Sequence, residues 1–403
     1  MRPVFLKNGM LMLNHLSSAI CLPADAASAT LVGRVWLNKV GPVLVCIKPD
    51  GVYDLSSAAA TMSDLLELED PVAAVRQNVG PRLGDTEAVL KNSSQDARKP
   101  SLPWFLAPCD LQAIKASGVT FISSMLERVI EEQARGDASR ADSVRQAVVA
   151  VIGDNLSSIK PGSSASAKLK EALLAQGAWS QYLEVGIGPD AEIFTKAQPM
   201  SAVGVGAEVG IHPGSHWNNP EPEIVLAVNS RGQVQGAALG NDVNLRDFEG
   251  RSALLLGKAK DNNASCAIGP FIRLFDAHFS LDTVRACDLA MQVTAANGFS
   301  MQGSSSMSKI SRDPLELVAH AFGPNHQYPD GFMLFLGTMF APTQDRHGPG
   351  QGFTHELGDV VTVSTATLGC LVNRVNASDK VAPWTYGIRA LMQDLNRRRV
   401  LKA

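Results

Sequence analysis

The 403-residue sequence has few cysteines, no excess of positive charge and no long hydrophobic run. Its six cysteines stand far apart without a CxxC pair, which excludes a zinc site built from paired cysteines and the disulfide framework of a small secreted protein. The formal net charge of −3, without a basic stripe, argues against a nucleic-acid partner. No apolar run approaches the roughly 20 residues of a membrane-spanning helix, so we expect no membrane partner. We therefore predict buried, reduced thiols in a cytoplasmic protein.

The N-terminal stretch MRPVFLKNGMLMLNHLSSAICLPADAASA has basic residues, an apolar patch and an AxA-like end, as a signal peptide would. Pro3 and Gly9 break the patch, and Asn14 and His15 interrupt it. We predict that this stretch belongs to the fold and is not a cleaved signal.

The composition is that of a globular protein with a sizeable core, because 45% of the residues are hydrophobic and 19% are charged. Residues 1–109 read as a smaller β-rich domain, with strands at TLVGRVWL and GPVLVCIKPDGVYDL and a turn at 49–51. Residues 110–180 have helical apolar spacing with mixed charges and read as a helical segment. Residues 181–403 return to strands and form the predicted catalytic domain. The expected fold class is α+β and rich in β structure.

The C-terminal part of the sequence contains signals for a turn, a helix start and a strand pair. AANG at 295–298 lies between two apolar runs and predicts a hairpin turn. Asp313 and Pro314 are suited to begin the helix LELVAHAFG. GDVVTVSTATLGCLVNRV predicts a final strand pair.

Three carboxylates lie on strands that otherwise read as core. Glu221 and Glu223 project on one face of a strand, because side chains alternate with period two, and Asp242 ends the next apolar run. If Ser230 and Arg231 form the connecting loop, Glu221 pairs with Gly240. Asp242 then lies within ~7–8 Å of Glu221 by diagonal pairing.

Carboxylates this close repel one another and need a cation, or one of them must take a proton. An all-oxygen site suits a hard divalent ion, and Mg²⁺ is predicted, with Mn²⁺ or Ca²⁺ as alternatives. The other interpretation is that Glu221 and Glu223 begin an edge strand and face water.

Polar residues after Asp242 are candidates for chemistry. Arg246 is suited to hold a substrate carboxylate or to brace a ligand carboxylate, and it also fits a surface ion pair. Lys258 and Lys260 lie in a Gly/Ser/Asn-rich segment, where a lysine next to a metal would serve as a base. Thr338 follows an apolar strand, where its hydroxyl could meet a ligand.

A resemblance to a known family joins these segments. The chain from about 190 to 375 resembles the catalytic domain of the fumarylacetoacetate hydrolase superfamily, because the following segments occur in the family's order: FTK at 194–196, NNPEPEIVLAV, GNDVNLRD, KDNNASCAIGP, YPDGFMLFLGT and GDVVTVSTATLGCLVN. The resemblance implies a mixed β-roll catalytic domain, here with a smaller N-terminal β domain and a helical insert, and a divalent metal, usually Mg²⁺.

The resemblance also implies roles for individual residues. Glu221, Glu223 and Asp242 match the three carboxylate ligands of the metal. Lys260 matches the active-site lysine, because it stands six residues before Cys266, and Lys258 does not fit that spacing. A further set is predicted to contact the substrate: Lys196, Arg246, Asp247 and Thr338.

Within this superfamily, the helical insert and the motif segments of this sequence most resemble those of the 2-keto-3-deoxy-pentonate dehydratases. The family's C–C bond hydrolases activate water with a histidine from a segment before the two glutamates, and no histidine lies between His15 and His212. We therefore predict a lyase that converts 2-keto-3-deoxy-D-pentonate to 2,5-dioxopentanoate and water, with Lys260 as general base. The alternatives are an acylpyruvate hydrolase or oxaloacetate decarboxylase on the same site, and a non-catalytic protein that binds a metal or a 2-oxo acid.

The proton donor for the leaving hydroxyl is open at the level of sequence. Four residues are candidates for this acid: Glu127, Glu131, Glu132 and His355. Relatives in the superfamily imply a homodimer or homotetramer.

Overall fold

The structure is a computed structural model that describes residue 13 and residues 16–152, 159–348 and 352–400, with only the backbone described for 149–152. Residues 1–12, 14 and 15, on which the interpretation of the N-terminal stretch depends, lie outside the described residues. In the described part of the chain, no helix is both long enough and apolar enough to cross a membrane.

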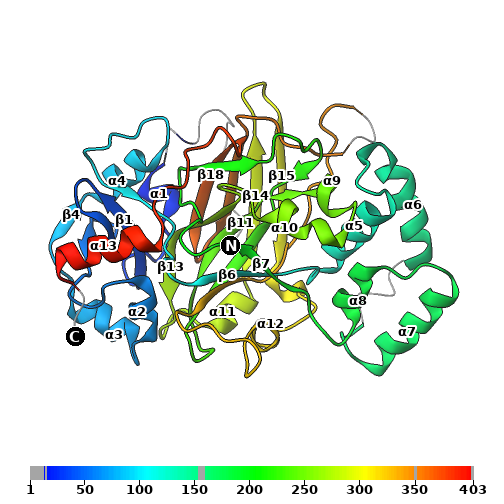
Figure 1. The fold of residues 1–403 in the computed structure, drawn as a ribbon, viewed down its shortest axis with the longest axis horizontal. Coiled ribbons are helices and arrows are strands. Elements are labelled where there is room, and N and C mark those ends of the chain that lie inside the picture. Colours follow the sequence, from blue (N-terminus) through cyan, green and yellow to red (C-terminus); the bar gives the residue numbers. More distant parts are fainter. Residues whose placement is uncertain (1–12, 14–15, 153–158, 349–351, 401–403) are drawn as a thin grey trace.

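Two β-sheets form the centre of the molecule (Figure 1). The larger sheet contains β1 Leu31–Leu37, β2 Gly41–Ile47, β3 Val52–Asp54, β4 Arg82–Gly84, β5 Trp104–Phe105, β6 Ala113–Ser117, β7 Ile193–Ala197, β10 Pro222–Val228, β11 Val234–Asp242, β13 Cys266–Leu274 and β16 Phe332–Phe335. Its order is β4-β3-β2-β1-β13-β11-β10-β16-β6-β7, with β5 paired to β1. The N-terminal strands therefore continue the sheet that carries the carboxylates.

The second sheet contains β8 Glu208–Ile211, β14 Asp288–Thr294, β15 Ser300–Ser306, β17 Val360–Thr365 and β18 Gly369–Ala377. Its order is β15-β14-β17-β18-β8. A short pair, β9 Asn218–Asn219 and β12 Asn244–Leu245, stands apart. Every residue of β10 and β13 is buried, so both faces of these central strands are covered.

Helices gather at the two ends of the molecule (Figure 1). At the end with the N-terminal strands lie α1 Ser18–Cys21, α2 Met62–Glu67, α3 Pro71–Gln77, α4 Thr86–Ser93 and the C-terminal α13 Ile388–Arg398. At the opposite end lie α5 Ile122–Gln133, α6 Ala141–Ile152, α7 Ser164–Ala175 and α8 Gln181–Ile187, which share a hydrophobic cluster of their own. The remaining helices are short: α9 Arg246–Glu249, α10 Leu256–Lys260, α11 Leu281–Arg285 and α12 Pro314–Ala321.

Several predicted elements are confirmed. The N-terminal strands form β1, β2 and β3, and β14 and β15 form the hairpin around 295–298. The Asp313 side chain accepts from Leu315 N and caps α12, which begins at Pro314. The final strand pair is β17 and β18, and all six cysteines are free and buried.

The helical interpretation of 110–121 is wrong. Residues 113–117 form β6, which pairs in parallel with β16 and antiparallel with β7. These partners are distant in sequence, and pairing with them overrides the local apolar spacing.

Candidate metal and catalytic site

The hairpin of β10 and β11 places the carboxylates at one end of two buried strands. Pro222 pairs with Asn241, and Asp242 N donates to Glu221 O at 3.0 Å. Glu221 therefore lies opposite Asp242, and the predicted pairing with Gly240 is wrong.

The register differs from the prediction for two reasons in the turn. The loop spans 229–233, where the Asn229 side chain accepts from the backbone N–H groups of Arg231 and Gln233. A β-bulge between Ala227 and Val228 then shifts the pairing further. The shift brings the two carboxylates closer than the sequence predicts.

Glu221, Glu223 and Asp242 offer carboxylate oxygens that all lie within 4.8 Å of one another. Each residue is about 1% exposed. A buried, all-oxygen set of three carboxylates has the donor chemistry that hard divalent cations prefer, so these residues fit a metal ion such as Mg²⁺, Mn²⁺ or Ca²⁺.

Cationic side chains surround Glu221 and Asp242. Lys260 Nζ lies 2.5 Å from Glu221 Oε2 and 3.1 Å from Asp242 Oδ2. Lys196 Nζ lies 2.8 Å from Asp242 Oδ1, and Arg128 donates to Glu221. Burial alone would raise the pKa of Asp242, but Lys196 and Lys260 hold it below its ordinary value.

Glu223 has neutral partners in place of cations. It accepts from Gly337 N at 2.7 Å and from Thr338 Oγ1 at 3.3 Å. Burial first and the charge of Asp242 second raise the pKa of Glu223 well above its ordinary value. A divalent cation among the three carboxylates would relieve this repulsion.

The helical insert contributes a buried arginine to the site. Arg128, on α5, lies 2.6 Å from Glu131 and 3.3 Å from Glu249 in addition to its contact with Glu221. Glu131 Oε1 lies 3.2 Å from Arg246 Nε, and burial raises the pKa of Glu131. The insert thus connects to the carboxylate end of the hairpin through charged groups.

The remaining acid candidates of the insert have other partners. Glu127 pairs with Arg145 at 2.6 Å, and Glu132 accepts from the Ser180 hydroxyl. Of the three candidates on α5, Glu131 is the one that the structure joins to Glu221, through Arg128.

His355 forms a buried pair with Asp359. Its Nδ1 lies 3.0 Å from Asp359 Oδ2, and its Nε2 is buried without a partner among the described residues. Burial lowers the pKa of His355, and the charges of Arg346 and Arg246 act in the same direction. The hydrogen bond and the charge of Asp359 oppose this lowering of the His355 pKa without reversing it.

The sequence did not single out Glu192, which the structure brings to the site. It immediately precedes β7, and two residues later the ring of Phe194 lies 5.6 Å from Lys260 Nζ. Burial raises the pKa of Glu192 to about 7, and the charges of Glu249, Lys260, Arg128 and Asp242 also act on it. The sequence did carry one signal. Side chains alternate along the extended segment EIFTK, so Glu192 and Phe194 lie on the same side as Lys196.

The residues that were predicted to contact the substrate have different partners in the structure. Lys196 is fully buried and also donates to Val243 O at 3.1 Å, and Thr338 contacts Glu223, so both residues brace carboxylates of the triad. The Asp247 carboxylate accepts from Ser215 Oγ at 2.8 Å and from His216 N at 2.7 Å. A contact of these side chains with substrate stays a prediction.

Arg246 lies between the insert and the hairpin end. Its guanidinium donates to Asn219 Oδ1 at 2.8 Å and to Pro342 O at 3.2 Å, and it lies over the ring of Trp217. It is 2% exposed, so it is not a surface ion pair.

The two candidate lysines have separate environments. Lys260 is buried among the carboxylates, whereas Lys258 is exposed and lies over the Phe248 ring at 4.9 Å. The spacing that distinguished Lys260 in the sequence agrees with this geometry.

About half of this chain is similar in sequence to curated proteins. It is 29% identical over 190 residues to 2-dehydro-3-deoxy-D-arabinonate dehydratase of Saccharolobus solfataricus, a match that covers 47% of this chain and 60% of that protein. It is 28% identical over 194 residues to a probable 2-keto-3-deoxyxylonate dehydratase of Haloferax volcanii, covering 48% of this chain and 63% of the relative. The chain therefore spans about 60% of the length of the curated relatives that it matches.

Solved structures share the fold. A 2-keto-3-deoxy-D-arabinonate dehydratase complexed with magnesium and 2,5-dioxopentanoate aligns with a TM-score of 0.58 at 20% identity, over 86% of this chain and 99% of that one. A fumarylacetoacetate hydrolase from Exiguobacterium antarcticum aligns with a TM-score of 0.52 at 18% identity, over 87% of this chain and 100% of that one. The expected β-rich α+β fold is confirmed.

A family model for the fumarylacetoacetate (FAA) hydrolase C-terminal domain matches residues 174–376, which is half of the chain and includes the whole carboxylate hairpin. The resemblance seen in the sequence is thereby confirmed, and the chain belongs to the fumarylacetoacetate hydrolase family.

Proposed function

We propose that this protein is a magnesium-dependent dehydratase that converts 2-keto-3-deoxy-D-pentonate into 2,5-dioxopentanoate and water. The observation that carries the proposal is the position of Lys260 Nζ beside Glu221 and Asp242, within a buried group of three carboxylates. The names of the two matched relatives, and the ligands of the structurally similar dehydratase, support the substrate class.

Glu221, Glu223 and Asp242 would hold the metal. When bound, Mg²⁺ would act as a Lewis acid on the C2 ketone and so acidify the C3 protons. Lys196, Thr338 and the backbone N–H of Gly337 hold two of these carboxylates in place.

Lys260 acts as the general base. In its neutral form the Lys260 amine takes a proton from C3, the C3–H electron pair forms the C3–C4 double bond, and the C4–O bond breaks. A proton then moves from C5 to C3, and the resulting C4–C5 enol becomes the aldehyde of 2,5-dioxopentanoate. One water leaves for each substrate, so atoms balance.

Glu192 acts as the general acid. The leaving C4 hydroxyl needs a proton, and a carboxyl with a pKa of about 7 is protonated in a large fraction of molecules at neutral pH. Glu131 is less suited to this role, because both Arg128 and Arg246 hold its carboxylate.

The first experiment incubates the purified protein with 2-keto-3-deoxy-D-pentonate, with Mg²⁺ or with EDTA, and follows NADP⁺ reduction by a coupled semialdehyde dehydrogenase. We expect turnover that requires metal. We expect Lys260→Ala to lose activity by at least about 10²-fold, and Lys258→Ala to keep it, because Lys258 is an exposed lysine on the same helix.

Three outcomes would contradict the proposal. Full activity after metal removal would exclude a metal-dependent reaction, and full activity of Lys260→Ala would exclude this base. Inactivity on the pentonate together with pyruvate release from an acylpyruvate would assign the site to C–C bond hydrolysis.

A further inference from the structure

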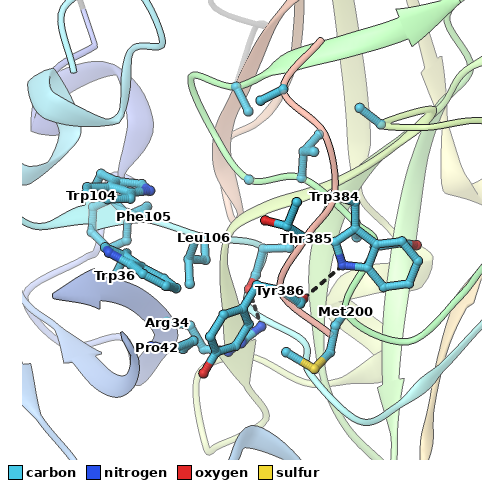
Figure 2. A pocket seen from close by; sticks show the side chains of 18 of the residues that line it. Arg34, Trp36, Pro42, Trp104, Phe105, Leu106, Met200, Trp384, Thr385 and Tyr386 are labelled. Carbon is cyan, nitrogen blue, oxygen red and sulfur yellow. Dashed lines mark hydrogen bonds between the residues drawn. The ribbon is translucent and has the colours of Figure 1, made fainter. Parts of the chain in front are cut away.

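A cavity lies between the N-terminal strands and the segment that precedes α13 (Figure 2). Its volume is about 230 Å³. For comparison, an apolar cavity of about 150 Å³ is enough to bind benzene, so this one has room for a substituted aromatic ring.

Aromatic rings form the walls of this cavity. Three of the five tryptophans line it, Trp36, Trp104 and Trp384, together with Phe105 and Tyr386. Trp36 and Trp104 stack with their centroids 5.8 Å apart, and Tyr386 meets Trp36 edge-on at 5.1 Å. Figure 2 shows the Trp36 and Trp104 rings on one side and the Trp384 ring on the other.

One cationic side chain in the wall lacks an acidic partner in the described part of the chain. The guanidinium of Arg98 lies 5.2 Å from the Trp104 ring centroid, and its NH2 group donates to Ser93 O at 2.7 Å. Its Nε is buried without a hydrogen-bond partner, and none of the described carboxylates lies within ion-pair distance of it. Burial lowers the pKa of Arg98 to about 10. A buried donor of this kind is costly unless a ligand satisfies it.

The other arginine of the cavity is already neutralised. Arg34 lies 3.7 Å from Asp110 and donates to the carbonyl oxygens of Ala107 and Cys109. No aspartate or glutamate lines the cavity among the described residues. The wall therefore offers one free positive charge, which suits a ligand with one negative charge.

We propose that this cavity binds an aromatic carboxylate, with its ring between the Trp36–Trp104 stack and Trp384 and its carboxylate at Arg98. Aromatic pairs and charge-assisted hydrogen bonds supply the attraction. A sugar acid fits less well, because its several hydroxyls need hydrogen-bond partners and most of this wall is apolar. Ser201 Oγ already donates to Gln198 O and the Asn263 amide to Ser378 O, so the Thr385 hydroxyl is the main polar group left for such a ligand.

The cavity also borders the segment that presents the proposed base. Asn263 and Ala264 line it, and they lie between Lys260 and Cys266. On the same side, Val203 lines the cavity and donates its backbone N–H to Cys266 O at 2.9 Å. The proposed ligand would thus be separate from the carboxylate triad while resting on the turn next to it.

The test titrates benzoate into the full-length protein by calorimetry and compares it with benzamide, its uncharged isostere. We expect benzoate to bind at least about 10-fold more tightly, and equally well with Mg²⁺ or EDTA, because a carboxylate at the triad would need the metal whereas this site does not. Arg98→Gln should lose the preference for benzoate, and Arg98→Lys should keep part of it. Arg285→Gln, which removes an arginine that Asp313 already pairs, is the matched control.

Several results would overturn the proposal. Equal affinity for benzoate and benzamide would exclude a carboxylate site at Arg98, as would unchanged benzoate binding by Arg98→Gln. Tighter binding of an aldonate than of benzoate would exclude the aromatic class, and binding that requires Mg²⁺ would locate the ligand at the triad. If Arg98→Gln does not fold, Trp384→Leu decides, because Trp384 is 47% exposed and its loss should weaken binding without unfolding the protein.

Discussion

The ionisation of single residues decides whether the proposed elimination runs at neutral pH. If Glu192 is the acid, Glu192→Gln keeps the size of the side chain and loses the proton, so we expect kcat to fall by about 10²–10⁴-fold. In the unaltered protein, activity should decline as pH rises through about 7, because the carboxyl then loses its proton. A steady-state pH profile of both proteins checks this expectation, and an unchanged profile in the variant would remove Glu192 from the mechanism.

The same substitution has a stability readout that does not depend on activity. A carboxyl whose pKa is raised in the folded state binds its proton more tightly there than in the unfolded chain, so folding loses stability as pH rises from about 4.5 to about 7. Glu192→Gln removes that loss. In EDTA, we expect the variant to gain stability over the unaltered protein at about pH 8 and to gain none at about pH 4. Urea unfolding at the two pH values measures the difference.

The sequence could predict the residues that chemistry marks by type and spacing. Glu221, Glu223 and Asp242 stand out as charges on apolar strands, whereas the choice of Lys260 over Lys258 came from the resemblance to the family, whose lysine has the same distance to Cys266. Glu192 could not be ranked in the same way, because an isolated glutamate before a strand is ordinary until tertiary packing surrounds it with protein and charge.

At the scale of an element, α5 matters because it carries a buried arginine that three carboxylates share. Arg128→Met would leave Glu131, Glu221 and Glu249 buried without this cation, and we expect a loss of about 3–5 kcal/mol in the free energy of unfolding without metal. Urea titration followed by circular dichroism gives this quantity.

Arg145→Met is the matched control for that loss. Arg145 lies on α6 of the same insert, and its side chain is 32% exposed beside Glu127, so its removal should cost less than about 1 kcal/mol. Equal losses in the two variants would mean that the charges around Arg128 are no more important than a surface pair.

The predictability of elements follows the range of the interactions that form them. The hairpin at 295–298 and the start of α12 depend on neighbouring residues, and both were predicted correctly. Strand β6 depends on β16 and β7, each more than 70 residues away, and it was read as helix. The predicted register of β10 and β11 was wrong because it depends on a bulge and a five-residue loop, which leave no strong mark in the sequence.

For the whole molecule, the continuous sheet joins the N-terminal strands to the metal site. β1 pairs with β13, and β13 pairs with β11, which ends at Asp242. A metal at the triad binds the folded chain and not the unfolded one, so it should stabilise this entire sheet by about 2.7 kcal/mol when its free concentration is about 100 times its Kd. We expect Mg²⁺ to raise the midpoint of thermal unfolding in a single transition that includes the N-terminal strands.

Fluorescence and circular dichroism followed together during heating test this expectation in a variant that keeps Trp36 as its only tryptophan, because its fluorescence then reports on β1 while the far-ultraviolet signal reports on all the sheets. Glu223→Gln, which keeps the volume of the side chain, should remove the response to Mg²⁺, and NaCl at equal ionic strength should not reproduce it in the unaltered protein. A Mg²⁺ shift that persists in Glu223→Gln would place the stabilising ion elsewhere. If Mg²⁺ raises the unfolding midpoint seen by circular dichroism but not the midpoint seen by tryptophan fluorescence, the N-terminal strands unfold on their own, despite the ladder between β1 and β13.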